Sequence, residues 1–124
     1  MKILVVDDEI DIQTLFQQRF RHEIRSGALS FAFALSGEAA LTYLEDHPSE
    51  IVLILSDINM PGMSGIELLR RIRIERPSAP PKIMMITAYN DNESYRQAKE
   101  YGADDFLTKP LDFTSLRQKL TTEL

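Results

Sequence analysis

Reactive side chains stand directly after four short apolar stretches of this sequence. Asp7 and Asp8 come after residues 3–6, Asp57 after 51–55 and one serine, Thr87 after 83–86, and Lys109 after 106–108. If these stretches are parallel strands, their carboxyl ends meet at one edge of the sheet, which is where open α/β folds bind ligands. The spacing therefore predicts a single pocket containing three carboxylates, a hydroxyl and an amine.

The chemistry of such a pocket depends on its negative charge. Three neighbouring carboxylates repel one another unless protons or a cation offset the charge. Mg²⁺ suits the site because it prefers oxygen ligands, uses one or two carboxylates and leaves positions for phosphoryl oxygens. The Lys109 ammonium and the Thr87 hydroxyl can both donate hydrogen bonds to those oxygens. Together the five side chains predict a site where a carboxylate carries a phosphoryl group.

The elements that position these side chains follow from the hydrophobic pattern. Short apolar stretches alternate with helix-period segments, which is typical of βα repeats around a parallel sheet. Residues 51–55 predict a central strand covered on both faces, whereas the alternating residues 29–35 predict an edge strand. Apolar residues at helical spacing predict one first helix with a single buried stripe, made of Ile12, Leu15, Phe16, Phe20 and Ile24.

Capping residues indicate where the next two helices begin. Ser36 is expected to cap a helix that ends before Pro48. Ser64 and Glu67 form a capping-box pattern, which predicts a helix that continues to about residue 76.

The last two helices differ in how much apolar surface they offer. Asn90 and Glu93 predict the start of a helix whose only apolar contacts are Tyr95, Ala98 and Tyr101. We therefore expect residues 92–101 to form the most loosely held helix. The final helix uses Phe113, Leu116 and Leu120 and runs to Leu124.

These elements add up to five βα units without an internal repeat. We expect one α/β domain over residues 1–124, with a five-stranded parallel sheet of order 2-1-3-4-5 and helices on both faces. Right-handed crossovers produce this doubly wound, flavodoxin-like arrangement.

Composition excludes several other classes of protein. The 124 residues contain no cysteine, so no disulfide framework or thiolate metal site is expected. No stretch has the length of a signal peptide's apolar region or a membrane span, so we expect a soluble, cytoplasmic protein without a membrane partner.

A net charge of −5 argues against direct nucleic-acid binding. We expect Arg70, Arg71, Arg73 and Arg76 to form a solvated helix face, and both histidines to lie on the surface.

The order of the reactive residues resembles a known signature. Asp7-Asp8, Asp57, Thr87-Ala88 and Lys109-Pro110, each after its own strand, are similar to the motifs of the receiver domain of bacterial two-component response regulators. The resemblance covers the chain from Lys2 to the last helix.

The resemblance implies a role for each residue of the pocket. Asp57 would accept a phosphoryl group from the phosphohistidine of a sensor histidine kinase, or from a small donor such as acetyl phosphate. Asp8, the Asp57 carboxylate and the backbone carbonyl of Asn59 would ligate Mg²⁺, with Asp7 acting mainly through a bound water. Lys109 would pair with the phosphoryl group, and its bond to the following proline would be cis.

The resemblance also implies a switch. The Thr87 hydroxyl would move toward the phosphoryl oxygens, and Phe106 would rotate into the space it leaves. This change would alter the surface of helix 92–101, strand 106–108 and the last helix, and so control a downstream effector or output domain. Phe106 replaces the tyrosine of many relatives, so the readout would depend on packing. Asn59 and Tyr89 would line the path of the attacking water and tune the phosphoryl lifetime.

Two other classes of function compete with this interpretation. A receiver-shaped docking domain would need no phosphorylation, and the intact set of five groups argues against it. A nucleotide- or flavin-binding protein would need a glycine-rich phosphate loop, which Asp7-Asp8-Glu9 does not supply, and an aspartyl phosphatase would need a second acid near Asp57. The sequence leaves open the cognate kinase, whether a longer protein contains this chain, and whether phosphorylation drives homodimer formation.

Overall fold

A five-stranded parallel sheet forms the centre of the computed structural model, which describes residues 1–76, 81–88 and 90–123. The strands lie in the order β2-β1-β3-β4-β5, which confirms the predicted α/β fold class. Their bounds are Lys2–Val6 (β1), Ser30–Ala34 (β2), Leu53–Asp57 (β3), Lys82–Thr87 (β4) and Asp105–Thr108 (β5). All five residues of β3 are buried, as expected for the central strand.

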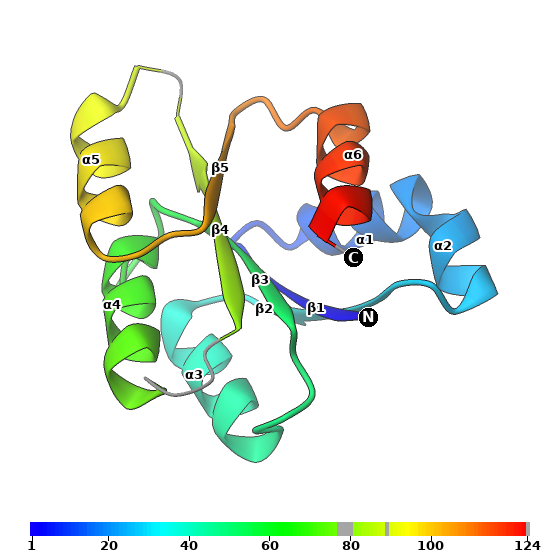
Figure 1. The fold of residues 1–124 in the computed structure, drawn as a ribbon, viewed down its shortest axis with the longest axis horizontal. Helices are drawn as coiled ribbons and strands as arrows, with labels where there is room; N and C mark the ends of the chain where they lie inside the picture. The colour runs from blue at the N-terminus through cyan, green and yellow to red at the C-terminus, as the bar shows by residue number, and fades with distance from the viewer. Residues whose placement is uncertain (77–80, 89, 124) are drawn as a thin grey trace.

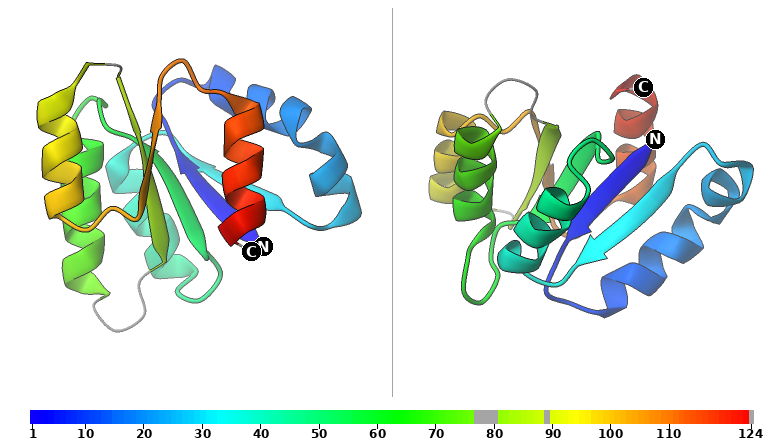
Figure 2. Two further views of the ribbon diagram at one scale, coloured as in Figure 1. Left: turned by 45° about the horizontal axis from the view of Figure 1, so that its top comes forward. Right: turned by 90° about the horizontal axis from the view of Figure 1, so that it is seen from below.

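Helices cover both faces of this sheet (Figure 1). One layer contains α1 (Asp11–Arg19), α2 (Arg21–Ser26) and α6 (Phe113–Glu123), and the other contains α3 (Gly37–Asp46), α4 (Gly65–Glu75) and α5 (Asn92–Glu100). Each layer packs on the sheet through its own cluster of buried apolar side chains. The amino end of the chain and the end of α6 lie near each other (Figure 2). Among the described residues, no helix is long and apolar enough to cross a membrane.

Side-chain caps begin four of the described helices, and at α6 the cap is the Asp112 carboxylate, which accepts from the Thr114 and Ser115 amides. The hydroxyl of Ser36 accepts a hydrogen bond from the Ala39 amide at 3.0 Å, and that of Ser64 accepts one from the Glu67 amide at 3.2 Å. Both caps were expected, although the Glu67 carboxylate pairs with an arginine and so supplies no second half of a capping box. The prediction for α5 is wrong by one residue, because the cap is Asp91.

The first helix is shorter than its apolar pattern predicts. The helix breaks at Phe20, whose backbone (φ −111°, ψ 21°) is not helical, and a separate short helix α2 follows. Phe16 and Phe20 are buried as predicted, but Ile24 is 36% exposed and α2 buries none of its residues. The predicted single stripe therefore ends at Phe20.

The break is tied to the last helix by Arg117. Its guanidinium donates to the Glu23 carboxylate at 2.7 Å and to the Arg19 carbonyl at 2.5 Å, and it lies 4.9 Å from the centre of the Phe20 ring. The hydrogen bond from Arg117 lowers the pKa of Glu23. These contacts hold α2 in place although its own side chains are not buried.

We expect Arg117→Gln to destabilise the fold by about 1 kcal/mol at neutral pH, because a partly exposed charged pair is lost. A carboxyl with a lowered folded-state pKa stabilises the fold above its unfolded pKa, and this contribution disappears as the pH falls through the folded value. The difference between variant and native chain should therefore shrink below the ordinary glutamate pKa. Urea unfolding, followed by circular dichroism at several pH values, measures this difference in the free energy of unfolding. Arg96→Gln, which breaks an exposed pair with Glu93, is the control and should cost less.

The arginines of α4 do not form a uniformly solvated face. Arg73 is only 21% exposed, and its guanidinium donates to the Gly102 carbonyl at 2.8 Å and to the Asp104 carboxylate at 2.8 Å. Arg76 donates to the backbone carbonyls of Leu44 and Pro48 at the end of α3. The expectation of a solvated face is correct only for Arg70 and Arg71, which form exposed pairs with glutamates.

Helix α5 is held mainly at its carboxyl end. Ala98 is its only residue classed as buried, and the Arg73 contacts fasten the turn that directly follows the helix. Tyr95 and Tyr101 are 43% and 41% exposed, so they contribute less to the core than the sequence suggested. The described contacts of α5 agree with a loosely held helix, but α2 buries even less, so α5 is not the least buried helix as expected.

Candidate functional site

The register of the sheet brings the predicted residues to one edge. Val6 of β1 is paired with Ser56 of β3, so Asp7 and Asp57 leave neighbouring strands at the same level. Asp57 is in turn paired with Ile86, the residue before Thr87. Thr87 is paired with Thr108, which precedes Lys109. Parallel pairing thus delivers all of these side chains to the carboxyl end of the sheet.

Three carboxylates form a compact cluster at this edge. One oxygen each of Asp7, Asp8 and Asp57 lies within 4.8 Å of the other two. Asp57 is 2% exposed and Asp7 is buried, whereas Asp8 faces solvent. Burial, with the nearby Asp57 charge, raises the pKa of Asp7, although its hydrogen bond from the Glu9 amide opposes the shift.

Lys109 forms an ion pair with this cluster. Its ammonium donates to the Asp57 carboxylate at 3.0 Å. Burial alone would lower the pKa of Lys109, but the hydrogen bond to Asp57 and the charges of Asp7 and Glu9 outweigh it and raise the pKa. The Lys109 amide donates to the Thr87 carbonyl at 2.8 Å, and the Lys109–Pro110 bond is cis as the resemblance implied.

The donor set of the cluster fits a hard divalent cation. All of its ligand atoms are oxygens, and a single ammonium does not balance three carboxylates. Burial and the neighbouring Asp57 charge both disfavour the ionised form of Asp7, and a bound cation would favour it. Asn59, the further predicted ligand, lies in the loop after β3 with its side chain exposed.

Thr87 and Phe106, the predicted switch residues, are not among the three clustered carboxylates. The Thr87 hydroxyl is buried and donates to the Leu107 carbonyl of β5 at 3.5 Å. The Phe106 ring is half-buried, and its centre lies 4.3 Å from that of Tyr95 on α5. The contact between Tyr95 and Phe106 was not predicted, because two aromatic residues eleven positions apart carry no signal of contact across elements.

Gly65 is a site residue that the sequence interpretation missed. Its amide donates to the Ile58 carbonyl at 2.7 Å, and a Cβ at this position would overlap the Asp57 carbonyl oxygen and lie 2.8 Å from Ile58 Cα. The first residue of α4 therefore presses directly on the backbone of the central aspartate. Glycine after the Ser64 cap was the available signal, but it also fits an ordinary helix start.

Other candidate residues lie outside this cluster. Tyr89, expected to tune the phosphoryl lifetime, falls outside the described residues. His22 and His47 are exposed, as expected.

Comparison with known proteins identifies the family. Residues 3–121 match the response regulator receiver domain family. The transcriptional regulatory protein ZraR of Escherichia coli K12 is 36% identical over 122 residues, which cover 98% of this chain and 26% of ZraR. A cyclic di-GMP phosphodiesterase of Thermotoga maritima is 32% identical over 124 residues, which cover 100% of this chain and 31% of that protein. The chain therefore spans between a quarter and a third of the length of these curated relatives.

Solved structures support the same assignment. The chemotaxis protein CheY4 of Vibrio cholerae has a TM-score of 0.81 at 28% identity, with 99% of this chain and 98% of that chain covered. A chain in the co-crystal structure of the Saccharomyces cerevisiae histidine phosphotransfer protein Ypd1 with the receiver domain of Ssk1 has a TM-score of 0.84 at 27% identity, covering 98% and 86%. Receiver domains bind Mg²⁺ at an acidic pocket, and this chain has an aspartate cluster at the corresponding sheet edge. With its family match over residues 3–121, the chain belongs to the receiver domain family of two-component response regulators.

Proposed function

We propose that this chain accepts a phosphoryl group on Asp57 and signals through the surface formed by α5, β5 and α6. The observation that carries the proposal is the position of Asp57, whose carboxylate is almost fully buried between two other aspartates and the Lys109 ammonium. A carboxylate confined in this way is oriented for attack and protected from competing contacts.

The proposed step is a phosphoryl transfer between two nucleophiles. An Asp57 oxygen forms the new O–P bond while the donor's N–P bond breaks, or its O–P bond if the donor is acetyl phosphate. The electron pair of the broken bond stays with the departing imidazole or acetate. Lys109, 3.0 Å from the attacking carboxylate, offsets charge on the phosphoryl oxygens once they replace its present partner.

Asp7, Asp8, Asp57 and the Asn59 carbonyl are the proposed Mg²⁺ ligands, Asp7 acting mainly through a water. Bound there, the ion would offset negative charge on the transferred group. The exposed position of Asp8 leaves one side of the cluster open to solvent and to a phosphoryl donor.

The proposed readout starts from the Thr87 hydroxyl. In the structure this hydroxyl is held by the Leu107 carbonyl through a long hydrogen bond of 3.5 Å. A phosphoryl oxygen is a stronger, charged acceptor and would draw the hydroxyl away from β5. Phe106 then has room to turn inward, which would break its ring contact with Tyr95 and release the loosely packed α5.

The proposed partners follow from this chemistry. A sensor histidine kinase or a phosphotransfer protein would be the donor, and a downstream effector or an output domain would read the altered surface. Catalysis would be confined to the chain's own phosphorylation and dephosphorylation, in a single domain that acts in the cytoplasm. Net charge −5 supports a protein partner over direct binding of nucleic acid.

Intact mass spectrometry tests the proposal. The chain is incubated with acetyl phosphate in the presence of MgCl₂, and in a parallel sample with excess EDTA. We expect a mass increase of one phosphoryl group only when Mg²⁺ is present. A chain that gains no phosphoryl group under either condition, with circular dichroism showing it folded, would contradict the proposal.

Mg²⁺ should also stabilise the folded chain. At about ten times its dissociation constant, an ion that binds only the native state adds about 1.4 kcal/mol to the free energy of unfolding. Urea unfolding with MgCl₂, compared with NaCl at equal ionic strength, measures this difference. Asp8→Asn should remove most of this stabilisation because Asp8 is a proposed Mg²⁺ ligand, and its exposed position lets the fold tolerate the change. Asp46→Asn on α3 should retain the stabilisation. Equal stabilisation of both variants would exclude the cluster as the binding site.

A further inference from the structure

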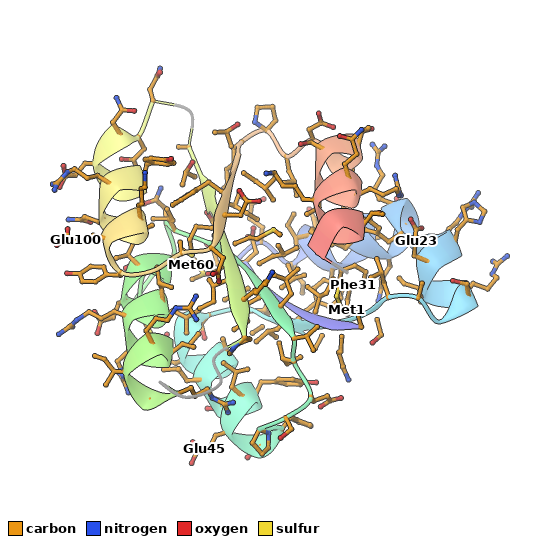
Figure 3. The ribbon with its side chains drawn as sticks, in the orientation of Figure 1. Met1, Glu23, Phe31, Glu45, Met60 and Glu100 are labelled. Atoms are coloured by element: carbon orange, nitrogen blue, oxygen red, sulfur yellow. The ribbon has the colours of Figure 1, made fainter. Side chains whose placement is uncertain are left out.

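An apolar groove lies between α2 and the edge strand β2, and none of the three clustered aspartates lines it. It has a volume of about 560 Å³, and its apolar lining comes from Ile24, Phe31 and Phe33. The two phenylalanine rings stack at 6.2 Å and are only half-buried, and the structure positions Phe31 on the side of α1, α2 and α6 (Figure 3). The break at Phe20 separates α2 from α1, and the Arg117 contacts hold it there.

The rim of this groove is basic, and its arginines have no protein partner among the described residues. Arg21 and Arg25, one helical turn apart on α2, both line it. Neither guanidinium has a hydrogen bond or ion pair with any described residue. Five other arginines pair with carboxylates, namely Arg70, Arg71, Arg73, Arg96 and Arg117. In a chain of net charge −5, two unpaired arginines beside an apolar groove favour an acidic ligand.

The groove also borders an unprotected strand edge. The Ser30 amide donates to Met1, and the Ala34 carbonyl accepts from Asp7, so these even-numbered residues face β1. Since both backbone groups of a residue in a parallel strand point the same way, Phe31 and Phe33 present theirs to the free edge. Exposed edges are normally blocked by charge or proline, and the Ser-Phe-Ala-Phe-Ala sequence of β2 has neither.

We infer that this groove binds an extended acidic segment of a partner protein. The segment adds to the free edge of β2, places alternate apolar side chains against Ile24, Phe31 and Phe33, and pairs its carboxylates with Arg21 and Arg25. This surface is separate from the phosphoryl site and from the α5–β5–α6 surface, so it serves recognition beyond the proposed switch.

Charge distinguishes this occupant from a second copy of the chain. Two β2 edges paired about a two-fold axis would bring the arginines of both α2 helices to the same interface, where like charges repel. The carboxylates of an acidic segment satisfy the same arginines.

Peptide display tests the inference. A library of random short peptides is selected on the native chain and counter-selected on the Arg21→Glu/Arg25→Glu double variant. We expect enriched sequences in which apolar residues alternate with aspartate or glutamate, since alternate side chains of a strand face the same side. Enrichment of basic sequences, or no enrichment, would overturn the inference.

An enriched peptide is then titrated against matched variants by fluorescence polarisation. The double variant should lose about tenfold or more in affinity, and Arg70→Glu/Arg71→Glu, with the same change in net charge, should stay within about twofold. Ile24→Asp, at an exposed position on a helix without buried residues, should weaken binding without unfolding the chain. Asp57→Asn should bind as the native chain does, which separates failure of this inference from failure of the proposed phosphorylation.

Backbone pairing has its own signature in amide hydrogen exchange. Bound peptide should slow exchange at Phe31 and Phe33 and leave Ala32 unchanged, because Ala32 already faces β1. The inference would be contradicted by equal affinity of both charge-reversal variants for the peptide, or by protection located elsewhere. It would also be contradicted by β2-dependent dimers in sedimentation, or by tight binding to phosphatidylserine vesicles without peptide binding.

Discussion

Asp57→Asn should abolish formation of the phosphoryl adduct with acetyl phosphate and Mg²⁺. Asparagine has nearly the same shape as aspartate, so it fits the buried position and can still accept a hydrogen bond from Lys109. Its amide has no ionised oxygen to form the bond to phosphorus. The variant also removes one of three carboxylates that repel one another. Its free energy of unfolding should therefore be no lower than that of the native chain. Intact mass spectrometry measures the adduct, and circular dichroism verifies the fold.

The control for this experiment is Asp46→Asn. Asp46 is an exposed carboxylate at the end of α3, outside the acidic cluster. The Asp46→Asn variant should form the phosphoryl adduct to the same extent as the native chain. An adduct on the Asp57→Asn variant equal to that on the native chain would assign the acceptor to another residue.

Gly65→Ala should damage both the fold and the reaction. The added methyl group would overlap the Asp57 carbonyl oxygen, and backbone cannot rotate aside as a flexible side chain can. Overpacking of this kind costs about 3 kcal/mol or more when the backbone must shift. The shift would move the Asp57 carboxylate from its place beside Asp7 and Lys109, so we expect slower adduct formation in the molecules that still fold. Urea unfolding and the rate of mass increase measure the two effects.

Gly27→Ala separates steric overlap from the conformational cost of losing a glycine. Gly27 has a φ of 83°, which disfavours alanine, but a Cβ there would meet nothing within 4 Å. We expect a loss of about 1 kcal/mol in stability and an unchanged phosphorylation rate. If Gly65→Ala resembled Gly27→Ala in both measurements, the contact with Asp57 would not matter for the site.

The strand ends were predictable because they depend on short-range patterns. Each apolar stretch is followed directly by its polar side chain, and parallel pairing converts that local order into a shared edge. The caps at Ser36 and Ser64 were equally local, since each hydroxyl bonds an amide three residues later. The sheet order and the clustering of Asp7, Asp8 and Asp57 thus follow from the sequence.

The missed features depend on contacts between residues far apart in the chain. Periodicity predicts an apolar face but not a break, so Ile24 seemed to continue the stripe past Phe20. In the sequence Arg73 resembles its exposed neighbours, but in the structure it is partly buried because it binds the distant residues Gly102 and Asp104. Gly65 fitted a helix start, and its closeness to Asp57 depends on how the loop between them folds back.

The contacts of Arg73 have a mechanical consequence for α5. Because they fasten Gly102 and Asp104, the end of the helix farthest from Thr87 is clamped. The opposite end begins at Asn92, and the helix has no buried side chain before Ala98. If phosphorylation displaces Thr87, as proposed, we therefore expect the exposed first turn of α5 to move more than its fixed carboxyl end.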